Sequence, residues 1–440
     1  MSIKSSNELL TKLVKKNLNR PCPVGLSALS RREFLRLSLL ATSTVALTAC
    51  GGSNAGTPVN IPTPTPTTDT PGALTISQAP QKIAIIGAGA AGLVAAYELD
   101  RAGHNITVLE ARERSGGRIH TLFSPFSDGQ FAEAGASRIP SNHDLTEAYA
   151  QHFDLTLDVF YPQSANYINI NGSNTELIPA SEYIALPPFP ASVNRSAYQK
   201  IRGGMFKLPQ AFGDALGDKM FFQTAVESII QDPDGVTINT VQGQQFVADR
   251  VLCTVPLPVL NKISFSPTLS AEKISAANGA YEYSASSRVF TKFNSRFWEN
   301  DGLNGWGDSS LPEEIWQPTW DDEQTPGILQ SYLRGVTAEQ FDTLSPDQQI
   351  DSVFDRWANA FPDLHSHISS THIHSWAAEQ WSGKAFAAPS AAQEAALGNH
   401  IGTAEGRIHF AGEHASGFHG WIQGALESGI RAAREIHEFG

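Results

Sequence analysis

Short apolar runs alternate with glycines and polar turns where the folded part of this chain is expected to begin. Residues 82–86 form a β-branched run, glycines follow at once, and residues 93–100 place apolar side chains at helical spacing before Gly103. A second apolar run, residues 106–109, ends at Glu110. The order strand, tight turn, helix and strand predicts an α/β fold that opens with a Rossmann-type nucleotide-binding unit.

Two interleaved lobes are expected, because 440 residues exceed the usual size of one domain. Short strands are predicted at residues 236–238, 245–248 and 251–255, between Gly and Asp turns, and residues 424–438 form an amphipathic helical pattern. We predict a Rossmann-type nucleotide-binding lobe and a second lobe, because the pattern weakens after residue 140 and a Trp- and Phe-rich region follows later. The predicted segments are residues 79–140, 203–275 and 391–440 for the first domain, and residues 141–202 and 276–390 for the second.

The first residues carry features of a targeting signal. The paired arginines in SRREFLR precede residues 37–49, a weakly apolar run shorter than the about 20 residues of a transmembrane helix. This pattern resembles the twin-arginine export signal, and the LTAC that follows resembles a lipoprotein box with Cys50 as the acylated residue. An ordinary buried helix is the alternative. We expect residues 1–49 to be a twin-arginine lipoprotein signal peptide and residues 50–78 to be a Pro/Thr-rich linker, which makes the protein exported, periplasmic or cell-surface, and lipid-anchored to a membrane.

Charge and cysteine content narrow the set of partners. Residues 1–49 contain eight of the 31 Lys and Arg and two of the 44 Asp and Glu, which leaves 23 against 42, a formal charge of −19. So acidic a body argues against nucleic acid as a partner. Cys253 stands alone once Cys22 and Cys50 are set aside, so no intramolecular disulfide is expected. No metal site is predicted.

Three glycines mark the first predicted turn. Gly87, Gly89 and Gly92 form G-x-G-x-x-G between the strand and the helix, and Glu110 ends the next strand. Such glycines let the backbone approach a pyrophosphate, the helix N-terminus offers N–H donors, and the carboxylate accepts ribose hydroxyls. Chance occurrence is the alternative to a dinucleotide site. The motif alone does not distinguish FAD from NAD.

The sequence beyond this motif resembles the flavin monoamine oxidase and L-amino acid oxidase family. EARERSGGR is similar to the family's second signature, which implies that Arg118 lies near the flavin diphosphate; a solvated basic turn is the alternative. FAGEHASGFHGWIQGALESG is similar to the carboxyl-terminal flavin segment, which implies that Glu413 holds the ribityl chain and that the following helix start faces the flavin ring. AVESI matches the strand whose valine, here Val226, holds the adenine.

The resemblance therefore implies the amine oxidase fold, with an FAD-binding domain and an interleaved α+β substrate-binding domain. Some members bind flavin covalently through a cysteine near the last motif, but EHASGFHG has none, so we expect non-covalent FAD. The FAD contacts that the resemblance and the glycine motif together imply are Gly87, Gly89, Ala90, Ala91, Gly92, Glu110, Ala111, Arg118, Gly135, Ala136, Ser137, Arg138, Val226, Glu413, Gly420, Trp421, Ile422, Gln423, Gly424 and Ala425.

Substrate choice is addressed by three segments. In L-amino acid oxidases the stretch similar to EAGASRIP carries an arginine that binds the substrate carboxylate, which implies this role for Arg138. The resemblance places Tyr332 of ILQSYLRG as a second carboxylate donor, and the His-Gly-Trp at 419–421 puts Gly420 and Trp421 against the substrate. Alternatively, Arg138 pairs with Glu133 or a flavin phosphate, and Tyr332 is an ordinary strand residue.

The implied reaction is FAD-dependent oxidative deamination of L-amino acids to a 2-oxo acid, ammonia and hydrogen peroxide. Trp376 and Trp381 either wall the substrate pocket or belong to the core. The alternative activities are a monoamine or polyamine oxidase, a membrane-linked amine dehydrogenase that uses a quinone instead of oxygen, and a flavin-binding partner protein without turnover. Homodimer formation is left open.

Two departures from the family bear on the mechanism, for which no catalytic residue is assigned. Arg288 stands where many members keep a lysine, and an arginine cannot lose its proton to act as a base. Lys292 would replace it only after a register shift. The interval between Arg138 and Gly204 is also shorter than in amino acid oxidases with a full helical domain, and His143 is a poor candidate for the histidine that some members contribute from it. Side-chain specificity is therefore not predicted.

Overall fold

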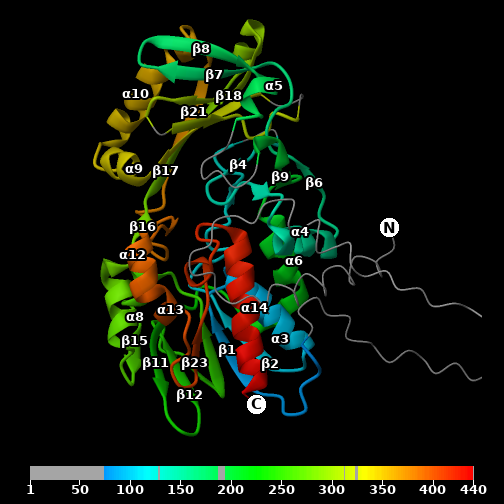
Figure 1. Ribbon diagram of the computed structural model, residues 1–440, viewed down its shortest axis with the longest axis vertical. Helices are drawn as coiled ribbons and strands as arrows, with labels where there is room; N and C mark the ends of the chain where they lie inside the picture. Colours follow the sequence, from blue (N-terminus) through cyan, green and yellow to red (C-terminus); the bar gives the residue numbers. More distant parts are fainter. Residues whose placement is uncertain (1–73, 127–128, 187–193, 312, 323–325, 440) are drawn as a thin grey trace, which may run out of the picture.

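The computed structural model describes residues 74–126, 129–186, 194–311, 313–322 and 326–439. The expected signal peptide, Cys50 and the linker up to residue 73 lie outside the described residues. Figure 1 shows an elongated molecule, with a parallel sheet and long helices in one half and a large second sheet in the other. None of the helices in the described ranges is long and apolar enough to cross a membrane.

A five-stranded parallel sheet forms the centre of the first half. Its order is β10 (Met220–Phe221), β2 (Asn105–Leu109), β1 (Lys82–Ile86), β14 (Arg250–Cys253) and β23 (Ile408–Phe410). Alternate side chains of β1 enter two different cores, since Ile83 and Ile85 pack on one face and Ala84 and Ile86 on the other. The α/β prediction is confirmed, but the strand predicted at residues 251–255 ends at Cys253, two residues before Val255.

Helices cover one face of this sheet and a second small sheet covers the other. The first layer contains α3 (Ala90–Arg101), α6 (Lys207–Leu216) and α14 (Ile422–Glu438), whose apolar sides share one core. Opposite them lies a four-stranded sheet in the order β13 (Gln245–Ala248), β12 (Val236–Thr240), β11 (Val226–Gln231) and β15 (Ser264–Ser266). This arrangement leaves the carboxyl ends of β1 and β2 open toward the second half of the molecule, as Rossmann-type sites require.

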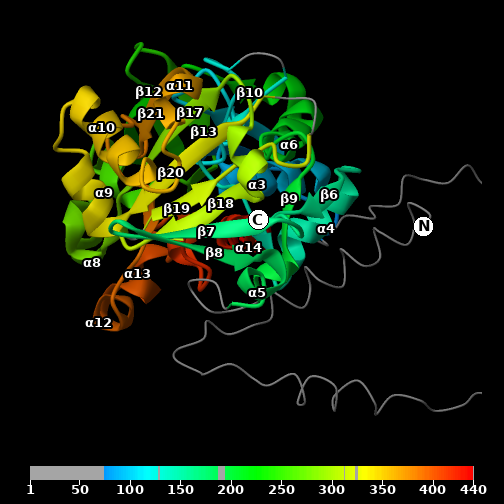
Figure 2. The ribbon, with the colours of Figure 1, turned by 90° about the horizontal axis from the view of Figure 1, so that it is seen from above.

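The second half is built on a seven-stranded sheet, seen from above in Figure 2. One face is covered by α9 (Gly335–Phe341), α10 (Pro346–Trp357) and α11 (Leu364–His367), which share an apolar core with the sheet. The other face carries aromatic side chains and looks toward the cofactor domain. The strand order is β21 (Ile368–Ser375), β17 (Ser286–Phe293), β20 (Ile328–Arg334), β19 (Glu313–Trp316), β18 (Leu303–Ser309), β7 (Asn166–Asn171) and β8 (Asn174–Pro179).

Helix α4 (Asp144–His152) departs from the predicted division into lobes. Residues 141–202 were expected to belong to the substrate-binding domain, yet Leu145, Ala148 and Tyr149 of α4 are buried in the core shared by α3 and α14. The apolar side of this helix matches the apolar side of α14, and the segment reaches the large sheet only at β7 and β8.

The remaining elements are short. They are β3 (Thr121–Leu122), β4 (Ala132–Glu133), β5 (Ile139–Pro140), β6 (Leu157–Val159), α5 (Ala180–Tyr183), β9 (Tyr198–Ile201), α7 (Leu257–Leu260), α8 (Ala271–Ser275), β16 (Tyr283–Ser284), β22 (Phe386–Ala387), α12 (Ala391–Gln393) and α13 (Asn399–Ile401), with 3-10 and π turns between them.

Candidate active site

A cavity of about 820 Å³ runs from the carboxyl ends of β1 and β2 to the large sheet. Both halves of the molecule line it, so neither half forms it alone. Its walls include most of the residues that the sequence singles out, namely Gly87, Gly89, Ala90, Ala91, Glu110, Ala111, Arg118, Gly135, Ala136, Ser137, Arg138, Val226, Tyr332, Glu413, Gly420, Trp421, Ile422 and Ala425.

Glycines shape the end of the cavity next to β1. Gly87 has φ +102°, and a Cβ there would lie 2.7 Å from the Thr254 hydroxyl. A Cβ on Gly89 would meet no atom within 4 Å, because this residue borders the open cavity. Helix α3 starts here without a side-chain cap and without an acidic residue in its first turn, so its N–H groups are available to an anion.

Glu110 stands at the other side of this end. Its carboxylate accepts hydrogen bonds from the Ala88 N–H at 2.7 Å and from the Arg112 N–H at 2.8 Å, which fixes it at the carboxyl end of β2. Val226, the first residue of β11, also borders the cavity. Open glycines, a free helix start and an acid held after the second strand fit the diphosphate and ribose of FAD.

Arg118 and Glu413 form an ion pair farther along the cavity. The Arg118 Nη1 donates to Glu413 Oε1 at 2.7 Å, and Glu413 Oε2 accepts from the Gly420 N–H at 2.7 Å. Burial by itself would raise the pKa of the Glu413 carboxyl, but the charge of Arg118 outweighs it, and this pKa lies below its ordinary value. Glu413 is therefore a charged anchor that holds the turn before α14 against the cavity wall.

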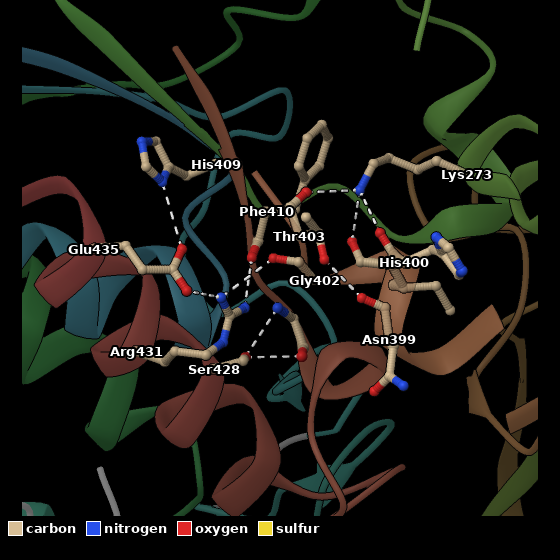
Figure 3. A network of polar contacts seen from close by, with 12 residues as sticks. Lys273, Asn399, His400, Gly402, Thr403, His409, Phe410, Ser428, Arg431 and Glu435 are labelled. Atoms are coloured by element: carbon tan, nitrogen blue, oxygen red, sulfur yellow. Dashed lines mark hydrogen bonds and ion pairs between the residues drawn. The ribbon is translucent and has the colours of Figure 1, made fainter. Parts of the chain in front are cut away.

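A polar network behind the cavity holds this segment in place (Figure 3). Ser428 of α14 exchanges two hydrogen bonds with the backbone of Gly412, at 2.9 and 2.8 Å. Arg431 donates to the Phe410 carbonyl at 2.7 Å and to the Gly402 carbonyl at 3.2 Å. Lys273, which is fully buried, donates to three carbonyls around α13 at 2.8 to 3.0 Å. The network joins α8, α13 and α14 to the strand that delivers Glu413.

Three of the expected cofactor residues do not border the cavity. A Cβ on Gly92 would lie 2.0 Å from the Gly87 carbonyl oxygen, and one on Gly424 would lie 2.4 Å from that of Phe418. These glycines permit close packing of the backbone beside the cavity. The Gln423 side chain turns away from it and accepts from the N–H groups of Leu145 and Thr146, both at 3.1 Å, so it holds the start of α4.

The far end of the cavity is formed by side chains of adjacent strands. In the sheet, Arg288 of β17 lies opposite Tyr332 of β20, and Tyr332 lies opposite Glu314 of β19. The Arg288 guanidinium is 4.2 Å from the centroid of the Tyr332 ring. A single transverse row of the sheet thus presents a cation, a phenol and a carboxylate at one place.

Arg138 meets this row through Glu314. Its guanidinium donates to the two Glu314 oxygens at 2.9 and 3.3 Å and to the Tyr161 hydroxyl at 3.0 Å. Arg334, at the end of β20, contacts the same carboxylate at 2.9 Å. Burial would raise the pKa of Glu314, but the charges of Arg138 and Arg334 lower it to about 2, so this carboxylate is ionised.

Glu314 was not predicted from the sequence, which offered Glu133 or a flavin phosphate as the alternative partner of Arg138. The missed signal is strand register: Glu314 becomes a neighbour of Tyr332 only when β19 and β20 are paired. Arg334, Trp316 and Lys262, which also line the cavity, were missed for the same kind of reason.

Arg288 borders the cavity and Lys292 does not, so β17 keeps the register in which arginine stands at the usual lysine position. The Arg288 guanidinium donates to the Glu133 carbonyl and lies 3.3 Å from the Ser137 hydroxyl.

Trp376 and Trp381 both border the cavity, and Trp376 is also buried. His143 packs edge-on against Trp421, with ring centroids 4.8 Å apart, but does not reach the cavity.

Comparison with solved structures supports the assignment of the amine oxidase fold. The solved structure of putrescine oxidase bound to putrescine has a TM-score of 0.70 at 19% identity, over 81% of this chain and 99% of its own. Cyclohexylamine oxidase from Brevibacterium oxydans has a TM-score of 0.71 at 18% identity, over 82% of this chain and 99% of its own. Both likenesses show the amine oxidase fold.

Similarity of sequence extends over the same region. A putative L-amino-acid oxidase of Bacillus subtilis, YobN, is 29% identical over 83% of this chain and 96% of its own length. The flavin-dependent L-tryptophan oxidase RebO of Lentzea aerocolonigenes is 25% identical over 82% of this chain and 99% of its own. The profile of the family described as flavin containing amine oxidoreductase matches residues 90–199 and 182–437. The chain therefore belongs to the flavin containing amine oxidoreductase family, and is an FAD-dependent enzyme.

Proposed function

We propose that the protein oxidises the α-amine of L-amino acids to the 2-oxo acid, ammonia and hydrogen peroxide. The observation that carries the proposal is the excess of positive charge along the cavity. Six cationic side chains line it against two carboxylates. The cations are Arg112, Arg118, Arg138, Lys262, Arg288 and Arg334, and the carboxylates are Glu110 and Glu413.

This excess is concentrated at the substrate end. Arg118 pairs with Glu413, whereas Arg138 and Arg334 share one acidic partner, Glu314, and Arg288 donates to the backbone carbonyl of Glu133. The whole chain carries a formal charge of −13, so the positive cavity contrasts with the rest of the molecule. A positive pocket favours a substrate with a carboxylate over a cationic amine, because the like charges would repel.

Arg138 has the donors needed to hold that carboxylate. Three of its five N–H donors serve Glu314 and Tyr161, so two remain for a ligand. Glu314 fixes the Arg138 guanidinium in place, and Tyr332 lies next to Glu314 on the neighbouring strand. A planar, permanently charged group held in this way suits two-point recognition of a carboxylate.

FAD, when bound, accepts a hydride from the carbon that bears the amine. The chain's own residues orient the substrate and exclude water. Trp421, Trp316 and Tyr332 form apolar walls around the charged groups, which limits solvent and strengthens the ionic contacts. The start of α14, next to Trp421, places the positive end of a helix dipole at the cavity.

An anaerobic substrate screen followed by air tests the proposal. We expect the flavin of the purified protein to bleach with at least one L-amino acid, and to recover its colour in air with formation of peroxide. Bleaching by simple amines but by no L-amino acid would assign the protein to the monoamine or polyamine oxidases instead. Bleaching without recovery in air, but with recovery on addition of a quinone, would identify an amine dehydrogenase.

We also propose that the enzyme is exported by the twin-arginine route, binds FAD non-covalently and is tethered by lipid at Cys50. A route that carries folded cargo suits a protein that acquires its cofactor in the cytoplasm. The absence of a cysteine in EHASGFHG supports non-covalent binding. Mass spectrometry of the protein extracted from membranes should find an acylated Cys50 at the N-terminus, and denaturation should release all of the flavin. An intact residue 1–49 segment or retained flavin would contradict these proposals.

A further inference from the structure

A small cavity of about 20 Å³ lies behind the wall of the active site. Ser137 and Trp316 belong to the lining of both cavities, so only a thin partition separates them. This volume is sufficient for one water molecule, provided that polar groups line it.

Gln330 supplies polar groups that need a partner. Its side chain is fully buried on β20, and neither amide atom has a hydrogen-bond partner among the described residues. Gln330 lines the small cavity together with Glu133, Lys200 and Ser137. A buried amide without partners is costly, and a water molecule within this cavity would satisfy it.

Glu133 is the acidic group of the small cavity. Its carboxylate accepts from the Thr121 hydroxyl at 3.0 and 2.8 Å and from the Met205 N–H at 2.8 Å. Burial raises the pKa of Glu133 to about 7, while the nearby charges of Arg288 and Lys200 act in the opposite direction. A carboxyl with this property changes its protonation state within the working range of an enzyme.

Ser137 lines both cavities, and its hydroxyl donates to the Gly135 carbonyl at 3.1 Å. Its hydroxyl lies 3.3 Å from the Arg288 Nη1, and Arg288 also donates to the Glu133 carbonyl. Arg288 cannot itself take up a proton, so the usual lysine position offers no base in this chain. Lys200, on the far side of the small cavity, binds the half-exposed Asp321 at 2.7 Å and so links the cavity to solvent.

We propose that Ser137, one water molecule held by Gln330, and Glu133 form a proton relay out of the active site. The N–H bond of the substrate ammonium breaks, the Ser137 hydroxyl and the water each accept one proton and pass one on, and an O–H bond forms on Glu133. The products of this step are the neutral amine and the protonated carboxyl, which afterwards releases its proton to solvent water. The relay rests on the proposed function only in requiring an amine substrate of some kind.

The rate of flavin reduction as a function of pH tests the relay. In the FAD-loaded wild-type enzyme, mixed anaerobically with any substrate that bleaches it, this rate should rise as the pH passes through about 7, because Glu133 accepts a proton only when ionised. In Glu133→Gln that ionisation should vanish from the profile, and the rate at neutral pH should fall by about 100-fold. The difference in this rate between Glu133→Gln and the wild type should shrink at high pH, where the substrate amine is already deprotonated when it binds.

A purely structural role of Glu133 predicts a different pH profile for flavin reduction. Loss by the same factor at every pH, or persistence of the ionisation near 7 in Glu133→Gln, would overturn the relay. Glu98→Gln is the matched control, because Glu98 is also fully buried and accepts from a hydroxyl, that of Tyr149 at 2.6 Å, but lines neither cavity. It should leave the pH profile unchanged.

Two further measurements keep the test decisive if Glu133→Gln does not fold. Gln330→Met removes the two amide atoms that would hold the water, and should weaken the dependence on pH in the same direction. Infrared difference spectra of the FAD-loaded protein across pH 7 need no substrate, and should show a carboxylic acid band that disappears on ionisation. An unaltered profile in Gln330→Met, or no carboxyl ionising in this range, would overturn the relay without touching the proposed substrate class.

Discussion

The two ends of the large cavity are built in different ways. The nucleotide end is made by the backbone of neighbouring residues. Gly87 and Gly89 border the cavity, Gly92 lets α3 pack closely against the turn, and the first turn of α3 provides donors. The substrate end is made by side chains from β17, β19 and β20, together with Arg138 from a separate segment. Under the proposed function, binding of the cofactor depends on backbone shape, whereas substrate choice depends on how charges from distant segments are combined.

The largest effect should follow from a substitution that disturbs the backbone at the nucleotide end. In Gly92→Ala the new Cβ would lie 2.0 Å from the Gly87 carbonyl oxygen, which neither the helix nor the turn can accommodate without moving. We expect the purified variant to contain almost no flavin, as measured by the ratio of flavin to protein absorbance.

Gly213→Ala is the matched control, because Gly213 also lies inside a helix but a Cβ there would meet only the Met220 sulfur, at 3.6 Å. It should retain full flavin and gain up to about 1 kcal/mol of stability from the better helix propensity of alanine. A flavin content in Gly92→Ala equal to that of Gly213→Ala would contradict the claim that FAD binding depends on the shape of the backbone at the nucleotide end.

The smallest effect should follow from a change just outside the substrate end. Lys292 lies on β17, four residues after Arg288, but does not border the cavity. Lys292→Met should therefore change kcat and KM for the best substrate by less than about twofold. A loss of activity comparable to that of Arg288→Met would indicate that β17 adopts another register in the working enzyme.

The same contrast explains what could be predicted from the sequence. The α/β fold, the glycine turn, Glu110 and the helix 424–438 follow from local patterns, and their residues lie where the motifs place them. Glu314 could not be found in this way, because it becomes a partner of Arg138 only after strand pairing. The location of α4 also depends on a complementary apolar surface that belongs to a helix at the other end of the chain.

Gln423 illustrates a further limit. It sits inside a motif that implies a cofactor contact, yet its side chain holds the start of α4. A motif specifies the path of the backbone more closely than the direction of each side chain. For that reason the resemblance predicts the path of the backbone along the cavity, and the structure gives the direction of single side chains.

Arg138→Met, compared for a matched pair of substrates, tests the central claim most directly. The pair consists of the amino acid that bleaches the wild-type flavin best and the amine obtained by removing its carboxyl group. If Arg138 binds the carboxylate, its loss should lower kcat/KM for the amino acid by about 100-fold, since truncating one partner of a buried charge pair costs about 2 to 5 kcal/mol. The amine should change by less than about threefold. Equal losses for both members of the pair, at unchanged flavin content, would contradict recognition of the carboxylate by Arg138.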